Sequence, residues 1–151
     1  VRGPFIASAY YNDESSDEKF HDGWLRTGDM AVMEPDGYFK IVDRAKDLVK
    51  SGGEWISSVD LEGALLAHPQ VRDAAVVGLP SKKWDERPVA VVVPADGSTP
   101  TLEAINEFLA DNFAKWWLPD ELVVVDEIPK TSVGKIDKKR IRADLAGMEL
   151  A

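Results

Sequence analysis

The chain has 151 residues, a net charge of −9 and a pI of about 4.7. This length holds one ordinary domain, or a small domain with part of another. The acidic charge argues against general nucleic-acid binding, because such a surface repels a phosphate backbone. With no cysteine, the protein has no disulfide, no thiolate nucleophile and no zinc–thiolate site. No apolar run approaches the ~20 residues of a membrane span and no signal peptide is visible, so we expect a cytoplasmic protein.

Residues 1–42 are rich in turn signals and aromatic side chains. The Asp36-Gly37 pair, followed by a strand-like run at 38–42, predicts a β-hairpin. The region has little core of its own, and we expect the chain to be a piece of a larger protein. Its strand edges and apolar side chains, such as Phe5 and Trp24, predict that residues 1–42 are disordered or pack against a second copy as a homodimer.

From Asp43 onward the pattern is that of a compact domain. The expected strands lie at residues 55–56, 71–79, 89–93 and 122–125. Ser58 is expected to cap a helix that turns Leu61 and Leu65 inward, and Thr101 to open a second. A last helix is expected from about Asp137 to Leu145. The order β-α-β-β-α-β-α predicts an α+β fold, with helices covering a three-stranded sheet.

The first of three polar motifs runs from Gly23 to Asp29 and ends in Thr27-Gly28-Asp29. A carboxylate just after a Thr-Gly turn can accept hydrogen bonds from two neighbouring hydroxyls, as on a ribose. The alternative is an aspartate that closes a turn with its own backbone.

The second motif spans residues 43–56 and contains Arg44, Lys46, Lys50 and the pair Gly52-Gly53. Adjacent glycines let a backbone approach a ligand closely or adopt positive φ. The alternating cations suit an anionic ligand. An exposed charged strand followed by a tight turn explains the same residues equally well.

The third motif, residues 129–142, contains six of the 18 basic residues and one of the 27 acidic ones. Pro129 and Gly134 shape a loop that aims Lys135 at an anion. Such a lysine is a mobile point charge, able to bind a carboxylate and a phosphate together. Solvated surface lysines at a helix start are the alternative.

The three motifs, in this order over about residues 1–145, resemble the adenylate-forming, AMP-binding enzyme superfamily. It includes acyl-CoA synthetases, adenylation domains of peptide synthetases and luciferases. The run Phe113–Pro119 is most similar to medium- and long-chain fatty-acid-CoA ligases, although core or interface positions explain its paired tryptophans as well.

The resemblance implies that residues 1–42 are the end of a large N-terminal domain. Residues 43–151 would be the small mobile C-terminal domain, which swings about a hinge at Asp43. These enzymes activate a carboxylic acid, here a fatty acid, with ATP and transfer the acyl group to CoA. Because the phosphate loop, the acyl pocket and the expected Mg²⁺ ligands belong to the large domain, this chain alone is expected to be inactive.

The resemblance also implies roles for individual residues. Lys135 would be the catalytic lysine of adenylation, stabilising the transition state between the carboxylate and the α-phosphate, and a target for acylation. Asp29 would bind the ribose of ATP and Arg44 the ribose or phosphates. Lys46 and Lys50 would contact the acyl-adenylate. The loop facing the pantetheine of CoA would consist of Gly52, Gly53, Glu54 and Trp55.

Two other functions fit the same motifs. One is an enzyme that adenylates aryl or amino acids and loads a carrier protein. The other is a non-catalytic binding module of the same fold, against which the intact Asp29, Arg44 and Lys135 argue. A full-length enzyme would be cytoplasmic or peripheral to a membrane.

Overall fold

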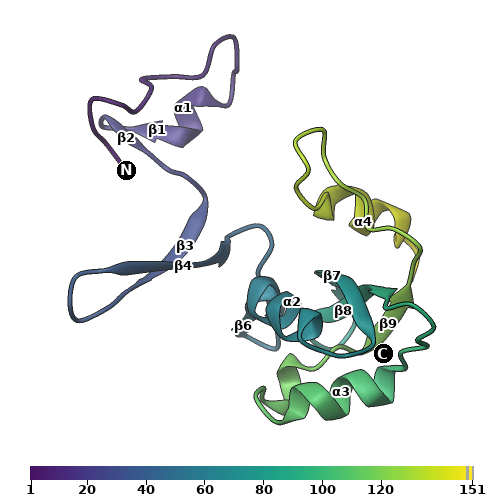
Figure 1. Ribbon diagram of the computed structural model, residues 1–151. Helices are drawn as coiled ribbons and strands as arrows, with labels where there is room; N and C mark the ends of the chain where they lie inside the picture. The colour runs from purple at the N-terminus through teal and green to yellow at the C-terminus, as the bar shows by residue number, and fades with distance from the viewer. Residues whose placement is uncertain (149, 151) are drawn as a thin grey trace. The chain divides into compact units, whose positions relative to one another are not determined.

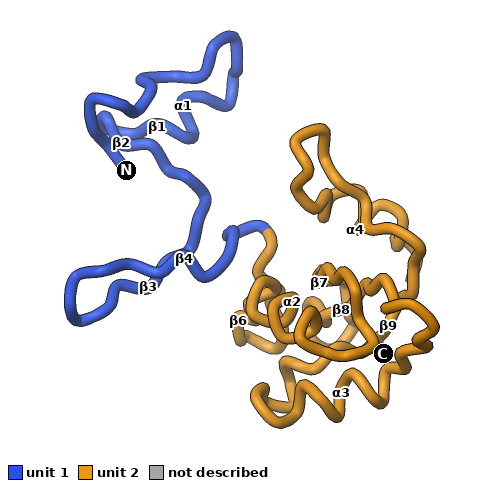
Figure 2. Tube along the Cα trace, viewed as in Figure 1, with its two compact units in different colours: residues 1–46 blue, residues 47–151 orange. Residues whose placement is uncertain are grey.

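The computed structural model describes residues 1–148 and 150, and it divides into two compact units, residues 1–46 and 47–151 (Figure 2). The sequence places the domain junction at Asp43. In the structure Asp43 is buried within strand β4 (Phe39–Arg44), and the division into units follows at Lys46. Among the described residues, no helix has the length and apolar character needed to cross a bilayer.

The first unit consists of a short helix and two separate hairpins. Helix α1 (Ser16–Lys19) leads into β1 (Phe20–His21), which pairs with β2 (Trp24–Leu25). Strand β3 (Asp29–Met33) pairs antiparallel with β4, and the expected Asp36-Gly37 turn connects them, with Gly37 at φ 88°. Most side chains of this unit are exposed, in agreement with the small core expected for it.

The second unit is built on one five-stranded sheet (Figure 1). Of the four strands expected from the sequence in this unit, three are β7 (Val71–Ser81), β8 (Asp85–Pro94) and β9 (Glu121–Val124), and the one at residues 55–56 falls in β6. Strand β8 pairs antiparallel with β7 along its length and parallel with β9. The hairpin β5 (Val49–Ser51) and β6 (Glu54–Ile56) widens the sheet from three strands to five, because β5 also pairs with β8. The α+β class is as expected.

Side-chain caps begin the three helices of this unit. Thr101 caps α3 (Leu102–Ala110), and Asp137 caps α4 (Lys138–Asp144), as the sequence predicts. The cap of α2 (Ser58–Leu66) was predicted one residue too late: the Oγ of Ser57 accepts from the backbone N–H of Asp60. Ser58 is the first helical residue, and its hydroxyl serves a different contact described below.

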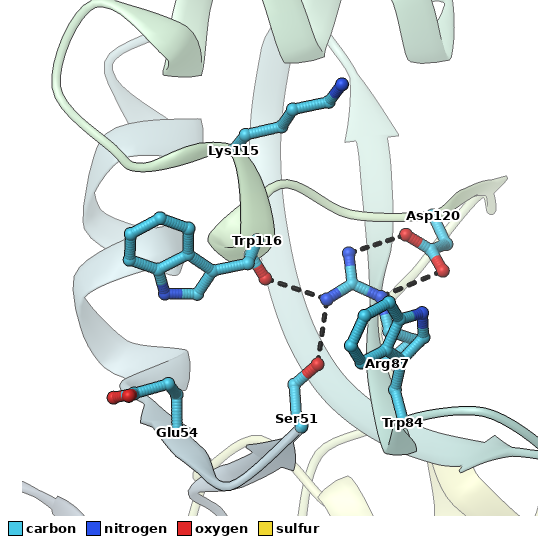
Figure 3. Close-up of a pocket in the computed structure, with 8 residues that line it drawn as sticks. Ser51, Glu54, Trp84, Arg87, Lys115, Trp116 and Asp120 are labelled. Carbon is cyan, nitrogen blue, oxygen red and sulfur yellow. Dashed lines mark hydrogen bonds and ion pairs between the residues drawn. The ribbon is translucent and has the colours of Figure 1, made fainter.

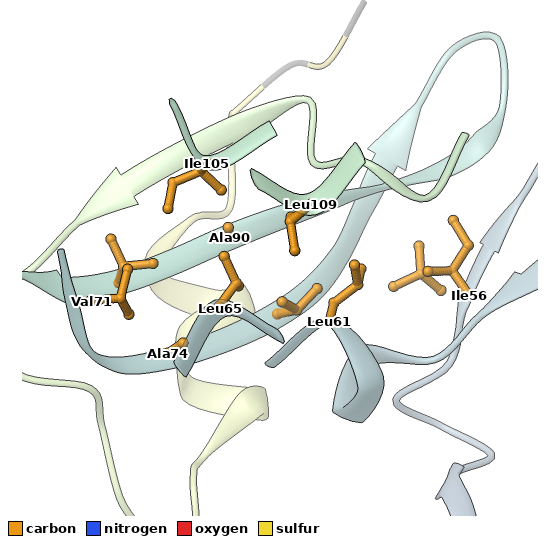
Figure 4. Packing of buried hydrophobic residues seen from close by; sticks show 11 residues of the cluster. Ile56, Leu61, Leu65, Val71, Ala74, Ala90, Ile105 and Leu109 are labelled. Carbon is orange, nitrogen blue, oxygen red and sulfur yellow. The ribbon is translucent and has the colours of Figure 1, made fainter. Parts of the chain in front are cut away.

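The hydrophobic core lies on both faces of the sheet, because β7 and β8 alternate their side chains between them. On one face Val76, Ala90 and Val92 meet the buried residues of α2 and α3, among them Leu61 and Ile105 (Figure 4). The opposite face packs against α4 through a second cluster, which comprises Ala75, Val77, Leu79, Val89, Val91, Val93, Ile128, Ile141 and Leu150. Helix α4 is thereby fixed to the sheet.

Candidate functional site

Asp29 and Arg44, which belong to different sequence motifs, face each other across the β3–β4 hairpin. The Nε of Arg44 lies 2.9 Å from Oδ1 of Asp29, and its Nη2 donates to the carbonyl of Thr27 at 3.3 Å. Gly28, at φ 79°, lies under the guanidinium. The pair presents a carboxylate and a cation together at the solvent-facing edge of the first unit, a combination suited to a hydroxyl-bearing anion such as a nucleotide.

The glycine loop of the second motif is the turn between β5 and β6. Gly52 has φ 58° and Gly53 has φ 91°, conformations that other residues rarely adopt. A Cβ on Gly52 would lie 2.8 Å from Cε3 of Trp84, whereas a Cβ on Gly53 would meet no atom within 4 Å. Gly52 is therefore needed for packing, and Gly53 leaves open space beside the turn.

The residues predicted around this loop divide between the two faces of the hairpin. Ser51 pairs with Glu54, and both line a pocket, while Lys50 pairs with Trp55. Since neighbouring residues of a strand point to opposite faces, Lys50 and Trp55 lie on the face away from the pocket. There Lys50 has an ion pair with Asp85 at 3.4 Å.

The pocket has a volume of about 460 Å³ and is mostly apolar (Figure 3). Its lining residues are Ser51, Gly52, Glu54, Trp84, Arg87, Lys115, Trp116 and Asp120. Lys115 and Trp116 come from the 3₁₀ turn η1 (Lys115–Trp117). Both tryptophans are partly exposed, and no ion-pair partner of the Lys115 ammonium is found among the described residues. Indole faces beside a solvated cation suit a ligand with an aromatic ring and a phosphate.

The paired tryptophans of the Phe113–Pro119 run have different surroundings. Trp116 is half exposed and lines the pocket. Trp117 packs on the core, with its ring 5.6 Å from that of Phe113. The core position that the sequence left open for these tryptophans therefore applies to Trp117.

Lys135 lies on a tight hairpin closed by the bridge between Lys130 and Ile136. The backbone N–H of Thr131 donates to the carbonyl of Lys135 at 2.7 Å, and Gly134 adopts φ 79°. The side chain of Lys135 is exposed, and no ion pair of its ammonium occurs within residues 1–148 and 150. Such a lysine is available to an anionic ligand, as the third motif predicts.

Two ion pairs attach α4, which follows this hairpin, to the rest of the second unit. Lys138 Nζ lies 2.8 Å from Oε1 of Glu62 and donates to the hydroxyl of Ser58 at 2.6 Å. One turn later, Arg142 lies 3.1 Å from Asp47, the first residue of the unit. These two basic residues of the third motif have anchoring contacts, whereas Lys135 does not.

The predicted site residues thus fall into two groups. Asp29, Arg44 and Lys46 belong to the first unit, and the others from Lys50 to Lys135 belong to the second. Trp84, Arg87 and Asp120 line the pocket but were not predicted as site residues. One signal was present in the sequence: Arg87 is a charge directly before the apolar run that begins at Pro88, in a strand buried on both faces.

No group of three or more His, Asp or Glu side chains able to hold a metal ion occurs in the described part of the chain. The Mg²⁺ ligands therefore remain a prediction for a further domain.

Solved structures with the same fold show which proteins this chain is similar to. o-Succinylbenzoate CoA synthetase from Bacillus subtilis, in complex with an acyl-adenylate, superimposes with a TM-score of 0.87 and 32% identity. The match covers 93% of this chain and 29% of that one. The amide bond synthetase McbA from Marinactinospora thermotolerans gives a TM-score of 0.86 and 35% identity, over 96% of this chain and 30% of that one. The chain therefore has the fold of one part of these synthetases.

Residues 60–135 match the model of the AMP-binding enzyme C-terminal domain, and this chain belongs to that family. It is 54% identical over 145 residues to a long-chain-fatty-acid–CoA ligase of Thermus thermophilus, covering 94% of this chain and 27% of the relative. A 3-methylmercaptopropionyl-CoA ligase of Ruegeria lacuscaerulensis is 47% identical, covering 94% and 26%. The chain thus spans about a quarter of the length of these curated relatives.

Proposed function

We propose that this chain is the C-terminal part of an ATP-dependent acyl-CoA ligase whose substrate is a medium- or long-chain fatty acid. The observation that carries the proposal is the 54% identity to a long-chain-fatty-acid–CoA ligase, extending over both units. A 43% identical medium-chain-fatty-acid–CoA ligase of Ectopseudomonas oleovorans supports the same substrate class. The two exposed features of the second unit, the Lys135 hairpin and the pocket beside Gly52, provide one site for each half-reaction.

In the first half-reaction a carboxylate oxygen attacks the α-phosphorus of ATP, and the bond to pyrophosphate breaks. Negative charge gathers on the phosphorus oxygens in the transition state, and the exposed ammonium of Lys135 stabilises it there. Asp29 would accept hydrogen bonds from the ribose hydroxyls. Arg44, already paired with it at 2.9 Å, would orient the carboxylate and reach the ribose or the phosphates. Lys46 and Lys50 supply further positive charge toward the acyl-adenylate.

In the second half-reaction the thiol of CoA attacks the acyl carbonyl, and AMP leaves. The pocket would hold the nucleotide end of CoA, with its adenine against Trp84 or Trp116 and its phosphates near Lys115. The turn at Gly52 and Gly53, together with Glu54, would lie along the pantetheine arm, which needs the open space beside Gly53. On the other face of the same hairpin, Trp55 would flank the arm where it leaves the turn.

The two half-reactions need different surfaces of the small domain, so we also propose that it rotates about the segment that begins at Asp43. The change of unit at Lys46 supports a hinge in this segment.

The test is pyrophosphate release by the full-length protein, with ATP and a panel of fatty, aromatic and amino acids, with and without CoA. We expect release with medium or long fatty acids, and acyl-CoA as the product. Release driven by an aryl or amino acid, with acyl transfer to a holo carrier protein rather than to CoA, would replace the proposed substrate class. No release with any acid would reject the activity.

A further inference from the structure

Arg87 is the most completely bonded charged side chain of the second unit. It is 7% exposed, and its guanidinium donates five hydrogen bonds of 2.7–3.1 Å. Nε and Nη2 hold both carboxylate oxygens of Asp120, at 2.9 and 2.7 Å. Since a guanidinium has five N–H groups, every donor of Arg87 is used inside the protein, and none remains for a ligand.

The acceptors of Arg87 come from separate segments that together surround the pocket (Figure 3). Nη1 donates to the hydroxyl of Ser51 at 2.8 Å and to the carbonyl of Trp116 at 2.7 Å. Nη2 also donates to the carbonyl of Leu118 at 3.1 Å. Arg87 on β8 therefore holds the strand before the glycine turn, the main chain of η1 and the start of β9 in one arrangement.

The bonds to two main-chain carbonyls determine where the side chains of η1 lie. Lys115 and Trp116 project into the pocket from a turn of three residues, which has no side-chain cap. Short 3₁₀ turns are weakly stabilised by their own hydrogen bonds. A planar fork of donors can hold this turn in place, whereas the point charge of a lysine cannot reach all of the same acceptors.

We propose that Arg87 is a positioning residue for the CoA half-reaction, fixing the wall of the pocket that receives the nucleotide end of CoA. This inference rests on the proposed function of the pocket. Arg87 touches neither the thiol nor the acyl group; it acts through Trp116 and Lys115. The glycine turn after Ser51 is also held by the pairing of β5 with β6, independently of Arg87. Loss of the guanidinium hydrogen bonds should therefore weaken binding of the nucleotide. The adenylation step and the reaction of a thiol without a nucleotide should both be unchanged.

The experiment compares wild type with Arg87→Lys in the full-length protein, supplied with acyl-adenylate and either CoA or pantetheine, which has the thiol but no nucleotide. For Arg87→Lys we expect the KM for CoA to rise by at least about tenfold, the loss expected for one or two good polar contacts. The KM for pantetheine and the rate of pyrophosphate release should stay within about twofold. The matched control is Arg72→Lys, because Arg72 forms only a surface pair with Asp96 at 3.6 Å.

The possible outcomes distinguish a failure of the positioning role of Arg87 from a failure of the proposed function of the pocket. If wild type uses CoA and pantetheine with the same KM, the pocket does not bind the nucleotide end of CoA, and the function proposed for the pocket fails. If wild type prefers CoA but Arg87→Lys keeps that preference, or loses both thiols and pyrophosphate release equally, the positioning role is overturned. Should Arg87→Lys fail to fold, Asp120→Asn is the second variant, because it weakens the hydrogen bonds of Arg87 to the Asp120 carboxylate. It must show the same selective rise in the KM for CoA.

Discussion

Lys135 is held by the main chain of its hairpin, and its side chain is left exposed for a ligand. Only the residues around it have fixed contacts: Lys130 pairs with Asp73 at 3.1 Å, and Lys138 pairs with Glu62 at 2.8 Å. The hairpin thereby fixes the main chain at Lys135, and no counter-ion of its ammonium is found among the described residues. A charge of this kind is effective where negative charge appears only in the transition state.

Lys135→Ala should lower the rate of acyl-adenylate formation in the full-length protein by about 10²–10³-fold, the usual loss for one preorganised transition-state contact. Thioester formation from supplied acyl-adenylate should remain within about threefold of wild type. Lys139→Ala, the substitution of a nearby exposed lysine, is the control and should leave both rates unchanged. Equal losses in the two half-reactions of Lys135→Ala would remove the role assigned to Lys135.

Gly53→Leu should have the opposite effect, slowing acyl transfer to CoA and sparing adenylate formation. The added side chain would occupy the open space beside the turn, and the positive φ of 91° adds local strain of ~1–2 kcal/mol. Gly97→Leu is a matched control, because Gly97 has φ 73°, meets no atom within 4 Å and lies outside the pocket. Unchanged consumption of acyl-adenylate by CoA in Gly53→Leu would show that this loop does not face the thiol.

At the scale of elements, α4 is attached to the second unit by charge as well as by its apolar face. The ion pair between Lys138 and Glu62 is nearly buried, with side chains 11% and 12% exposed, and Glu62 also accepts the backbone N–H of Val76. By contrast, the pair of Arg140 and Asp144 lies on the exposed face of the same helix. The carboxylate of Asp144 raises the pKa of Arg140 above its usual value by hydrogen bonding, which does not change the charge of Arg140 at neutral pH.

Lys138→Met should lower the free energy of unfolding of the chain by ~3–5 kcal/mol, because it removes the ammonium from a buried carboxylate. Arg140→Met should leave the free energy of unfolding nearly unchanged, because the pair that it removes is an exposed i,i+4 pair that solvent screens. Urea denaturation followed by circular dichroism measures both. A loss below ~1 kcal/mol for Lys138→Met would mean that the apolar packing of α4 and its ion pair between Arg142 and Asp47 hold the helix without Lys138.

At the scale of the whole molecule, the two units differ in how they bury apolar surface. The second has helices and a sheet with a core on both faces. The first leaves large side chains of its β3–β4 hairpin exposed, among them Met33, Tyr38 and Phe39. A two-stranded hairpin with such a surface is marginally stable by itself and tends to associate.

The chain of residues 1–151 should therefore self-associate, or lose order in residues 1–42, while residues 47–151 should be folded and monomeric. Light scattering after size-exclusion chromatography, at several concentrations, measures the association. Amide hydrogen exchange measures order in the first unit. A strictly monomeric full chain with protected amides throughout β3 and β4 would contradict this prediction.

Local sequence patterns were sufficient to predict most of the helices and strands of the second unit. The continuous apolar runs of β7 and β8, the spacing of Leu61 and Leu65, and the caps Thr101 and Asp137 each depend on neighbours in sequence. The cap of α2 was misplaced because two adjacent serines carry the same local signal, and the tertiary contact of Ser58 with Lys138 distinguishes them. The extra strand β5 was missed because three residues form a strand only when β6 and β8 lie beside them.

The α+β class, the family and the motifs that contain Asp29, Arg44, Gly53 and Lys135 can be predicted from the sequence, because they depend on residue type and short spacing. What those motifs form in space depends on the tertiary structure. It paired Asp29 with Arg44 across a hairpin and turned Lys50 and Trp55 away from the pocket. It also gathered Trp84, Arg87 and Asp120 into one wall. Contacts between residues more than 30 positions apart, such as those of Arg87, follow from the packing of strands and carry no local signal.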